Sequence, residues 1–172
     1  MNLTPSQFGY IRIGFGTDLH RLTPGDGVWL GGIHIPCGVT AKAVSDGDVL
    51  LHALVDALLG AAALGDIGEH YPESRVEPGE PSSRFVTETL VLVRSYGLSL
   101  INVDCIVDMD VVHLGETKKD IRRRIAALLE LDVSRVNVKA KTAEGLGPVG
   151  EGKAVSAQVV VLAEMSSGEK GL

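Results

Sequence analysis

The sequence predicts a single α/β (α+β) domain in which a four-stranded sheet is layered with helices. Segments rich in β-forming residues alternate with segments of helical periodicity, and no repeat or linker interrupts them. Hydrophobic residues make up 45% of the 172 residues, which is enough for one sizeable core. We assign this domain to residues 10–165, with a flexible N-terminal extension at 1–9 and a flexible tail at 166–172.

The first half of the chain predicts two β segments and a central helix. Residues 10–17 (YIRIGFGT) alternate and end in Gly and Thr, as a strand does. Residues 27–36 place β-forming residues around a Gly-Gly pair, which predicts a hairpin or a bent strand. From 45 to 66, apolar residues recur at helical spacing after Ser45 and Asp46, which are good N-cap residues. This helix is apolar around most of its circumference, so we expect it to be buried.

The second half continues the alternation. The expected elements are a Pro-rich loop at 69–83, a helix at 82–95, a strand at 98–112, an amphipathic helix at 115–131, and strands at 135–142 and 153–165 around a glycine-rich loop. The last strand is aliphatic on both faces. One of its faces therefore needs a partner beyond the helices, and another subunit is a candidate.

Charge and composition exclude several classes of function. The net charge is −6, from 22 acidic and 16 basic residues, whereas nonspecific binding to nucleic acid or to an anionic membrane needs a basic surface. No apolar stretch approaches the ~20 residues that span a bilayer. The N-terminus lacks the pattern of a signal peptide, and Cys37 and Cys105 read as free thiols. We expect a cytoplasmic protein that binds no nucleic acid and no membrane.

Three residues have the chemistry of a metal site. Asp18 and His20 are two positions apart, so in a strand their side chains point to the same face. With His52, early in the central helix, they supply the three ligands of a catalytic zinc that keeps a fourth position open. Asp56, one turn beyond His52, is placed to orient its imidazole. The spacing alone leaves another interpretation open, in which Asp18 caps a turn and both histidines are ordinary partly buried side chains.

Two further clusters carry hydroxyls and carboxylates. In the SDGD segment that opens the central helix, we expect Asp46 and Asp48 to hold hydroxyls or to order the turn. Thr142 and Glu144 are two positions apart where a predicted strand ends, ahead of the glycine-rich loop, so we expect their side chains on the same face. A Thr hydroxyl donates to phosphate oxygens, and a Glu holds Mg²⁺ that bridges phosphates. The alternative is a plain strand end followed by an exposed acid.

Together these clusters resemble the 2-C-methyl-D-erythritol 2,4-cyclodiphosphate synthase family. The segments RIGFGTDLH, SDGDVLLHALVDALLGAAALGDIGEHYP and VNVKAKTAEGLG stand in family order, and the resemblance covers residues 11–164. It implies a homotrimer with a β-prism-like core, interfacial active sites and a hydrophobic cavity on the threefold axis. It also implies a phosphorus–oxygen lyase of non-mevalonate isoprenoid biosynthesis. Such an enzyme converts 4-diphosphocytidyl-2-C-methyl-D-erythritol 2-phosphate to 2-C-methyl-D-erythritol 2,4-cyclodiphosphate and releases CMP.

The resemblance also implies roles for single residues. Zn²⁺ would be bound by Asp18, His20 and His52, and Mg²⁺ or Mn²⁺ by Glu144 together with substrate phosphates. The implied substrate-binding residues are Asp18, His20, Ser45, Asp66, Gly68, Lys141 and Thr142, and the implied catalytic residues are Thr142 and Glu144. A phosphate monoester is already ionised near neutral pH, so the reaction needs alignment and charge screening rather than a general base.

Several positions depart from the family pattern. Val44 replaces a His that contacts substrate phosphate, and Val111 and Val112 replace a Pro-Lys pair of the nucleotide-binding loop. Glu151 and Lys153 stand where the family has Arg and then Glu, at the end of the threefold cavity, so the order of the basic and the acidic residue is reversed. These departures keep an alternative open: a diverged, non-catalytic, trimeric metal-containing protein that binds a nucleotide or an isoprenoid diphosphate. The intact metal positions favour the cyclase.

Overall fold

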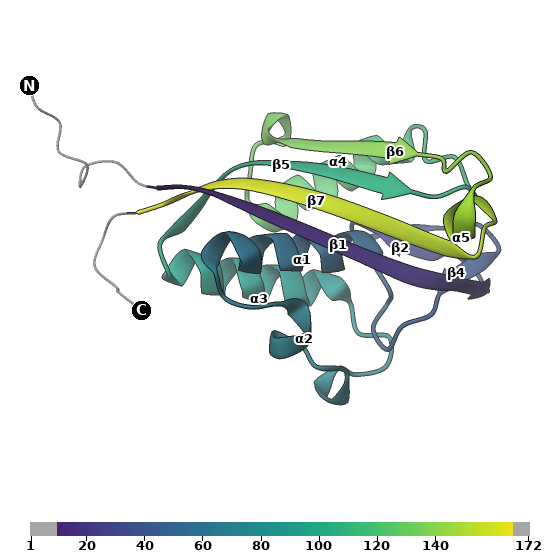
Figure 1. Cartoon of the computed structure of the whole chain (residues 1–172), viewed down its shortest axis with the longest axis horizontal. Helices are drawn as coiled ribbons and strands as arrows, with labels where there is room; N and C mark the ends of the chain where they lie inside the picture. The colour runs from purple at the N-terminus through teal and green to yellow at the C-terminus, as the bar shows by residue number, and fades with distance from the viewer. Residues whose placement is uncertain (1–9, 167–172) are drawn as a thin grey trace, which may run out of the picture.

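A computed structural model describes residues 10–166 as a mixed sheet with helices packed on one face (Figure 1). The five-stranded sheet has the order β4 (Val39–Ala41), β1 (Tyr10–Pro24), β7 (Ala154–Met165), β5 (Leu98–Asp108) and β6 (Val136–Lys141). The helices are α1 (Val49–Ala62), α2 (Ile67–His70), α3 (Ser82–Ser95), α4 (Thr117–Leu129) and α5 (Gly147–Gly150), with 3-10 turns at Glu73–Arg75 and Val133–Arg135. Only β5 and β6 pair in parallel among the strands of these described residues.

The expected α/β class is confirmed, but the expected number of strands in the sheet is wrong. The fifth strand, β4, has three residues and pairs with the last residues of β1. So short a strand has no alternating pattern that the sequence could reveal. β1 runs to Pro24, beyond the predicted end at Thr17, so it contains both Asp18 and His20. The predicted hairpin forms a separate two-stranded sheet, β2 (Val28–Leu30) with β3 (Ile33–Ile35).

The central helix α1 is buried, as predicted, and it lies unusually close to β1. A Cβ atom built on Gly14 would lie 1.7 Å from the carbonyl oxygen of Ala57, and one built on Gly16 would lie 2.0 Å from that of Ala53. Only glycine leaves room for this approach. The helix begins after Asp48, whose side chain accepts from the Leu51 N–H, rather than after the predicted Ser45 or Asp46 caps. The glycines therefore set α1 directly against the strand that carries Asp18 and His20.

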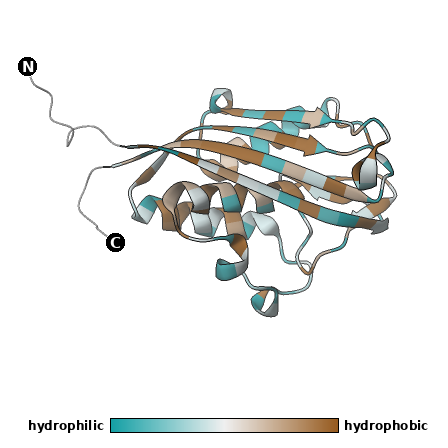
Figure 2. Cartoon of the chain, in the orientation of Figure 1, coloured by the Kyte–Doolittle hydropathy of each residue, from teal (hydrophilic) through white to brown (hydrophobic). Residues whose placement is uncertain are grey.

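The face of the sheet away from the helices is open. Ile11, Ile13 and Phe15 of β1 are 61–69% exposed there, and Val160 of β7 is 41% exposed. Figure 2 shows apolar residues along the strands as well as along α1. An exposed apolar face of this kind is typical of a surface that contacts a partner, which the sequence of β7 predicts.

Two other expectations concern the ends of the chain and membranes. The predicted extension at 1–9, and the predicted tail except for Ser166, lie outside the described residues. Across 10–166 no single helix has the length and hydropathy to cross a membrane. The segment pair Val49–Ala62 and Ile67–Arg75 satisfies the criterion only together, with a bend of 97°. All but three of the α1 residues belong to the buried core.

Candidate metal centre and adjoining cavities

β1 and α1 bring Asp18, His20 and His52 together, as the sequence predicted. Asp18 Oδ2 lies 3.2 Å from His20 Nε2 and 3.0 Å from His52 Nδ1, and the two ring nitrogens are 3.1 Å apart. Ligand atoms around a tetrahedral zinc at about 2.0–2.1 Å are themselves about 3.3 Å apart. The three atoms thus outline one face of a tetrahedron, and this group can bind a metal ion. The side chains are 12–25% exposed, which leaves a side open to a ligand.

The electrostatics of the cluster favour the protonation states that bind metals. Burial raises the pKa of Asp18, but the hydrogen bond with His52 and the charges of both histidines outweigh it and leave this pKa below its ordinary value. Burial lowers the pKa of His20, against the opposing effect of Asp18. A carboxylate and a neutral imidazole are the forms that coordinate a metal.

His52 is held from behind by a hydrogen-bonded chain. Its Nε2 lies 2.9 Å from Ser82 Oγ and 3.2 Å from Ser45 Oγ. The fully buried Ser82 hydroxyl donates in turn to the Asp46 carboxylate. With Nδ1 facing the metal position, Nε2–H donates to Ser82, and the chain ends on a negative charge. Such a partner fixes the tautomer and the orientation of a ligating histidine.

Asp56 does not have the role predicted for it. Its Oδ1 accepts a hydrogen bond of 2.7 Å from the Ile67 N–H, so it ties α1 to the start of α2. The orienting function falls instead to Ser82, at the first position of α3 and thirty residues beyond His52. No sequence spacing relates these two residues. Ser82 was therefore missed by the sequence analysis.

The SDGD segment orders the turn before α1, as predicted. Asp46 accepts hydrogen bonds from the Asp48 N–H and from the backbone N–H of Ser82. The buried Asp48 carboxylate accepts from the N–H groups of Gly31, Gly32 and Leu51. Burial raises the pKa of Asp48 to about 6, although these donors oppose the shift. The segment thus joins the β2–β3 hairpin to the helix that carries His52.

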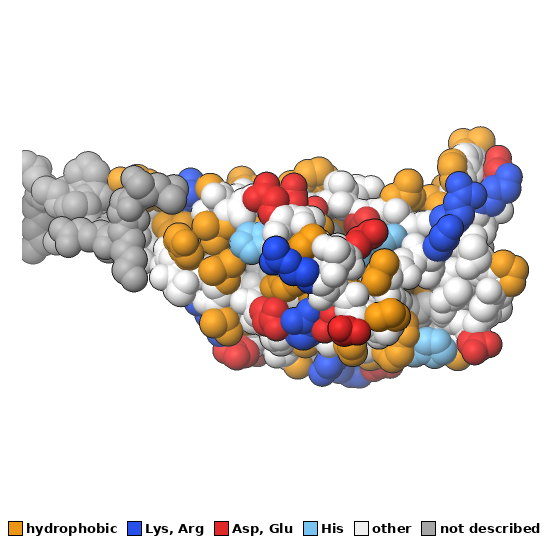
Figure 3. Space-filling view, turned by 90° about the horizontal axis from the view of Figure 1, so that it is seen from below, with side chains coloured by type: hydrophobic (Ala, Val, Ile, Leu, Met, Phe, Trp, Pro, Cys, Tyr) orange, Lys and Arg blue, Asp and Glu red, His pale blue; other side chains and the backbone are white. Residues whose placement is uncertain are grey.

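A cavity of about 290 Å³ opens beside His20 and His52. Ser45 and Gly68, both predicted to bind substrate, line it. Asp66 does not; its side chain accepts from the Glu69 N–H at 3.0 Å and caps α2. Figure 3 views the molecule from below, and it shows acidic and basic side chains intermixed over this face.

Several lining residues of this cavity were not predicted as part of a site. Lys42 and Glu73 bring opposite charges to its wall. Val44, already noted as a departure from the family pattern, also lines the cavity, and its side chain has no hydrogen-bond donor. Tyr71 and Phe85 also line it, and their rings stack with centroids 4.7 Å apart. These residues come from loops, from the 3-10 turn and from α3, so only the folded chain brings them beside the predicted metal ligands.

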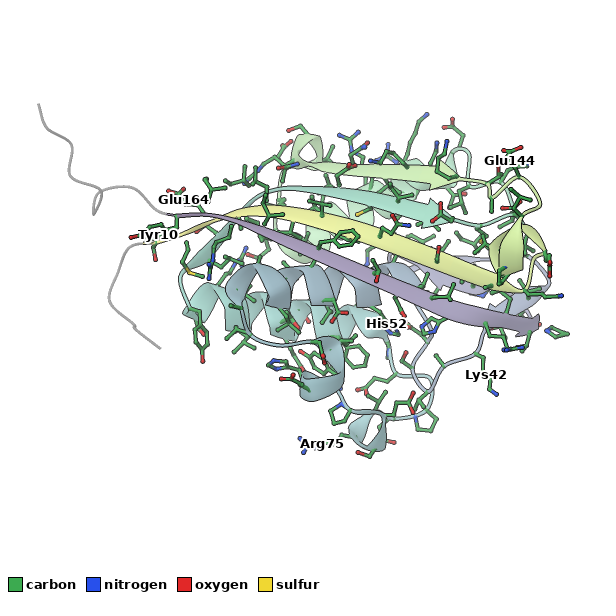
Figure 4. All side chains as sticks on the ribbon, viewed as in Figure 1. Tyr10, Lys42, His52, Arg75, Glu144 and Glu164 are labelled. Atoms are coloured by element: carbon green, nitrogen blue, oxygen red, sulfur yellow. The ribbon has the colours of Figure 1, made fainter. Side chains whose placement is uncertain are left out.

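The other predicted residues lie elsewhere in the chain. Lys141 and Thr142 line a second cavity, of about 160 Å³, together with Val112, His113 and Lys118. The linings of the two cavities share no residue. In Figure 4, His52 lies below β1 and Glu144 beyond the end of β6, towards opposite edges of the sheet. Within one chain, therefore, the predicted zinc ligands lie apart from Glu144, the predicted ligand of the second cation.

Glu144 sits at a strained position in a tight turn. The Leu146 N–H donates to the Ala143 carbonyl at 2.9 Å, and the two central residues, Glu144 and Gly145, have φ angles of 52° and 75°. Positive φ at both central positions is the signature of a type I′ turn. For a residue such as Glu this conformation costs about 1–2 kcal/mol. The Thr142 hydroxyl donates to the Glu144 carboxylate.

A mixed α/β domain with an Asp-His-His cluster beside a cavity defines the class: a protein with a candidate metal-dependent active site. A match to the YgbB family spans residues 11–164, and the chain belongs to this family.

Proteins with established names support this assignment. A relative from Solibacter usitatus, named 2-C-methyl-D-erythritol 2,4-cyclodiphosphate synthase, is 45% identical over 90% of this chain and 98% of its own length. One from Gloeobacter violaceus with the same name is 46% identical over 90% and 95%. The solved Plasmodium falciparum IspF in complex with CDP superposes with a TM-score of 0.81 at 33% identity, over 92% of this chain and 99% of that one. The bifunctional IspDF from Campylobacter jejuni gives a TM-score of 0.86 at 37% identity, over 91% of this chain and 43% of that one.

Proposed function

We propose that the protein is a zinc-dependent cyclase that converts 4-diphosphocytidyl-2-C-methyl-D-erythritol 2-phosphate to 2-C-methyl-D-erythritol 2,4-cyclodiphosphate and releases CMP. The observation that carries the proposal is the triangle of ligand atoms from Asp18, His20 and His52, which has the dimensions of a zinc site. It occurs in a chain whose full-length relatives are named as this synthase. The same names favour a lyase over a non-catalytic binding protein.

In the proposed reaction, the substrate's own 2-phosphate attacks the β-phosphorus of its diphosphate. One phosphorus–oxygen bond forms, the bond from the β-phosphorus to the CMP oxygen breaks, and CMP leaves as the anion. Asp18, His20 and His52 would hold Zn²⁺, and Glu144 would hold Mg²⁺ or Mn²⁺. These cations, when bound, screen the charges of the phosphates. The protein itself needs no general base, because the attacking phosphate is already ionised.

The remaining residues would bind and orient the substrate. The Ser45 hydroxyl, on the wall of the first cavity, would donate to the 2-phosphate. Lys42, on the same wall, would supply an ammonium group to the same anion, where Val44 has no donor. Gly68 and the neighbouring Asp66 would contact the methylerythritol hydroxyls.

The second cavity would hold the nucleotide part of the substrate. Lys141 and the Thr142 hydroxyl would face the diphosphate there. CDP is bound in the solved Plasmodium falciparum relative, which supports a cytidine nucleotide as the ligand. Val112 lines this cavity, so apolar contact is part of any recognition of the base.

We further propose that the working unit is a homotrimer with a β-prism-like core. The two cavities share no residue within one chain, so a neighbouring copy would bring Glu144 to the zinc ligands. The open sheet face, with exposed Ile13 and Phe15, supplies an apolar surface for that association. The alternative, a trimeric metal-containing protein that only binds a nucleotide or isoprenoid diphosphate, draws its support from Val44, Val111 and Val112.

The proposal is tested by ³¹P NMR of the zinc-loaded protein with Mg²⁺ and the cytidine diphosphate substrate. The expected result is the joint appearance of CMP and the cyclic diphosphate. Absence of turnover, with zinc bound and the trimer intact, would contradict the cyclase and favour the binding protein. Sedimentation of the same sample gives the oligomeric state.

A further inference from the structure

The turn that carries Glu144 is held by a carboxylate from another part of the chain. Asp110 follows the end of β5, and its Oδ1 accepts a hydrogen bond of 2.7 Å from the Ala143 N–H. Its Oδ2 accepts one of 3.3 Å from the Gly145 N–H. The two donors flank Glu144 on either side. Both oxygens of Asp110 therefore face the backbone of the turn.

Glu144 needs such a restraint more than the other non-glycine residues that have a positive φ angle. Three non-glycine residues have positive φ within the described chain: Ala63, Glu130 and Glu144. Ala63 and Glu130 end helices, where their N–H groups bond to helix carbonyls and stabilise the left-handed conformation. Glu144 has no helix before it, and type I′ turns favour Asn, Asp or Gly at its position. Without an external anchor the turn would relax and carry the Glu144 carboxylate away.

We propose that Asp110 is a positioning residue, which fixes the turn so that the Glu144 carboxylate faces the divalent cation and the substrate phosphates. This inference rests on the proposed function of Glu144. In this proposal Asp110 acts through the backbone of the turn and not as a ligand, since both of its oxygens accept from backbone N–H groups there. It acts by keeping an unfavourable backbone conformation populated before the ion arrives, so that binding does not have to order the turn.

The test uses the full-length, zinc-loaded protein and its Asp110→Ala variant. Hydrogen exchange of the Ala143 and Gly145 amides reports the contact directly and does not depend on turnover. We expect both amides to exchange about tenfold faster or more in the variant. The Mg²⁺ concentration for half-maximal CMP release should rise about 10–100-fold, the usual effect of losing a residue that orients a metal ligand. Zinc content and kcat at saturating Mg²⁺ should change little.

Matched variants separate positioning from general damage. Asp132→Ala removes an exposed carboxylate that accepts from the Ser134 N–H in a surface turn, and it should leave the Mg²⁺ requirement unchanged. Asp110→Asn retains one acceptor and should give an intermediate Mg²⁺ requirement. In the Glu144→Gln background, Asp110→Ala should have no additional effect on the Mg²⁺ response, because the two residues act through one carboxylate.

Two results would overturn the inference. One is unchanged amide exchange in Asp110→Ala; the other is faster exchange with an unchanged Mg²⁺ requirement. If the wild-type protein releases no CMP, the proposed function fails separately. The inference is then judged by Mn²⁺ binding in the presence of CDP, which Asp110→Ala should weaken about 10–100-fold. Equal Mn²⁺ affinity in both proteins would overturn it.

Discussion

His52 Nε2 lies 2.9 Å from the hydroxyl of Ser82, a side chain with no exposure to solvent. That hydroxyl donates its only proton to Asp46, so towards His52 its oxygen can only accept a hydrogen bond from the imidazole N–H. The contact leaves Nδ1 of His52 to point at Asp18 and His20. A side chain outside the ligand set thus determines which nitrogen of His52 faces the metal position.

Ser82→Ala should weaken metal binding without abolishing it. Loss of an orienting partner typically costs 10–100-fold in metal affinity, roughly, and we expect this range for zinc measured by competition with a chelator. His52→Ala removes a ligand and should lose zinc altogether. Ser95→Ala, at the exposed end of the same helix, is the control and should bind zinc as the wild type does. Equal zinc affinity in Ser82→Ala and the wild type would show that the contact does not orient the ligand.

Glu144→Gln should distinguish the zinc requirement from the Mg²⁺ requirement. The variant retains Asp18, His20 and His52, so zinc content should equal that of the wild type. Turnover should become insensitive to Mg²⁺, because an amide is a much poorer ligand than a carboxylate. Rates of CMP release across a Mg²⁺ titration check this prediction. Normal stimulation of the variant by Mg²⁺ would remove Glu144 from the second cation site.

Lys42→Met should impair substrate binding more than the chemical step. A charge-assisted hydrogen bond contributes about 1.5–3 kcal/mol, so its loss should raise KM about tenfold or more at nearly constant kcat. Lys119→Met is the matched control, because Lys119 of α4 pairs with the N-cap residue Glu116 and lines neither cavity. The measurement is the KM and kcat of both variants from steady-state kinetics. The proposed contact is wrong if the two variants have the same KM.

The sequence predicted that Asp18, His20 and His52 form one cluster, because part of its geometry is local. Asp18 and His20 share a face through the two-residue repeat of a strand, and β1 does extend through both. His52 joins them only because Gly14 and Gly16 let α1 approach β1, a tertiary effect that spacing does not encode. Long elements such as α3 and β7 were placed within a residue or two, since a repeated pattern identifies them.

The parts that the sequence did not predict depend on contacts between distant segments. Ser82 replaces Asp56 as the partner of His52, although Asp56 has the more suggestive spacing. Asp110 holds the Glu144 turn from 33 positions away, at the end of a different strand. Such contacts follow from the packing of loops and helix ends, where no periodic pattern exists.

Gly16→Ala should destabilise the protein and loosen the metal site. The added Cβ would overlap the Ala53 carbonyl, and α1 would have to move away from β1. Overpacking of this kind costs about 1–3 kcal/mol or more. Gly60→Ala is the contrast within α1: nothing lies within 4 Å of its Cβ position, so it should stabilise the helix by about 0.5–1 kcal/mol. Thermal denaturation of both variants should give shifts of opposite sign; a shift of the same sign would contradict this packing.

Asp48 should make the stability of the protein depend on pH between about 4 and 6. Its pKa is raised by burial from 3.8 to about 6 in the folded chain, so the fold favours the protonated carboxyl. The stabilisation from this group is complete below the unfolded pKa and is lost as pH rises through the folded pKa. Asp48→Asn resembles the protonated side chain at every pH. Relative to this variant, the wild type should lose on the order of 3 kcal/mol of unfolding free energy between pH 4 and pH 7, from about 1.4 kcal/mol per pKa unit. Denaturant unfolding of both proteins at the two pH values measures the difference, and a constant gap would show that Asp48 has the same pKa in the folded and unfolded chains.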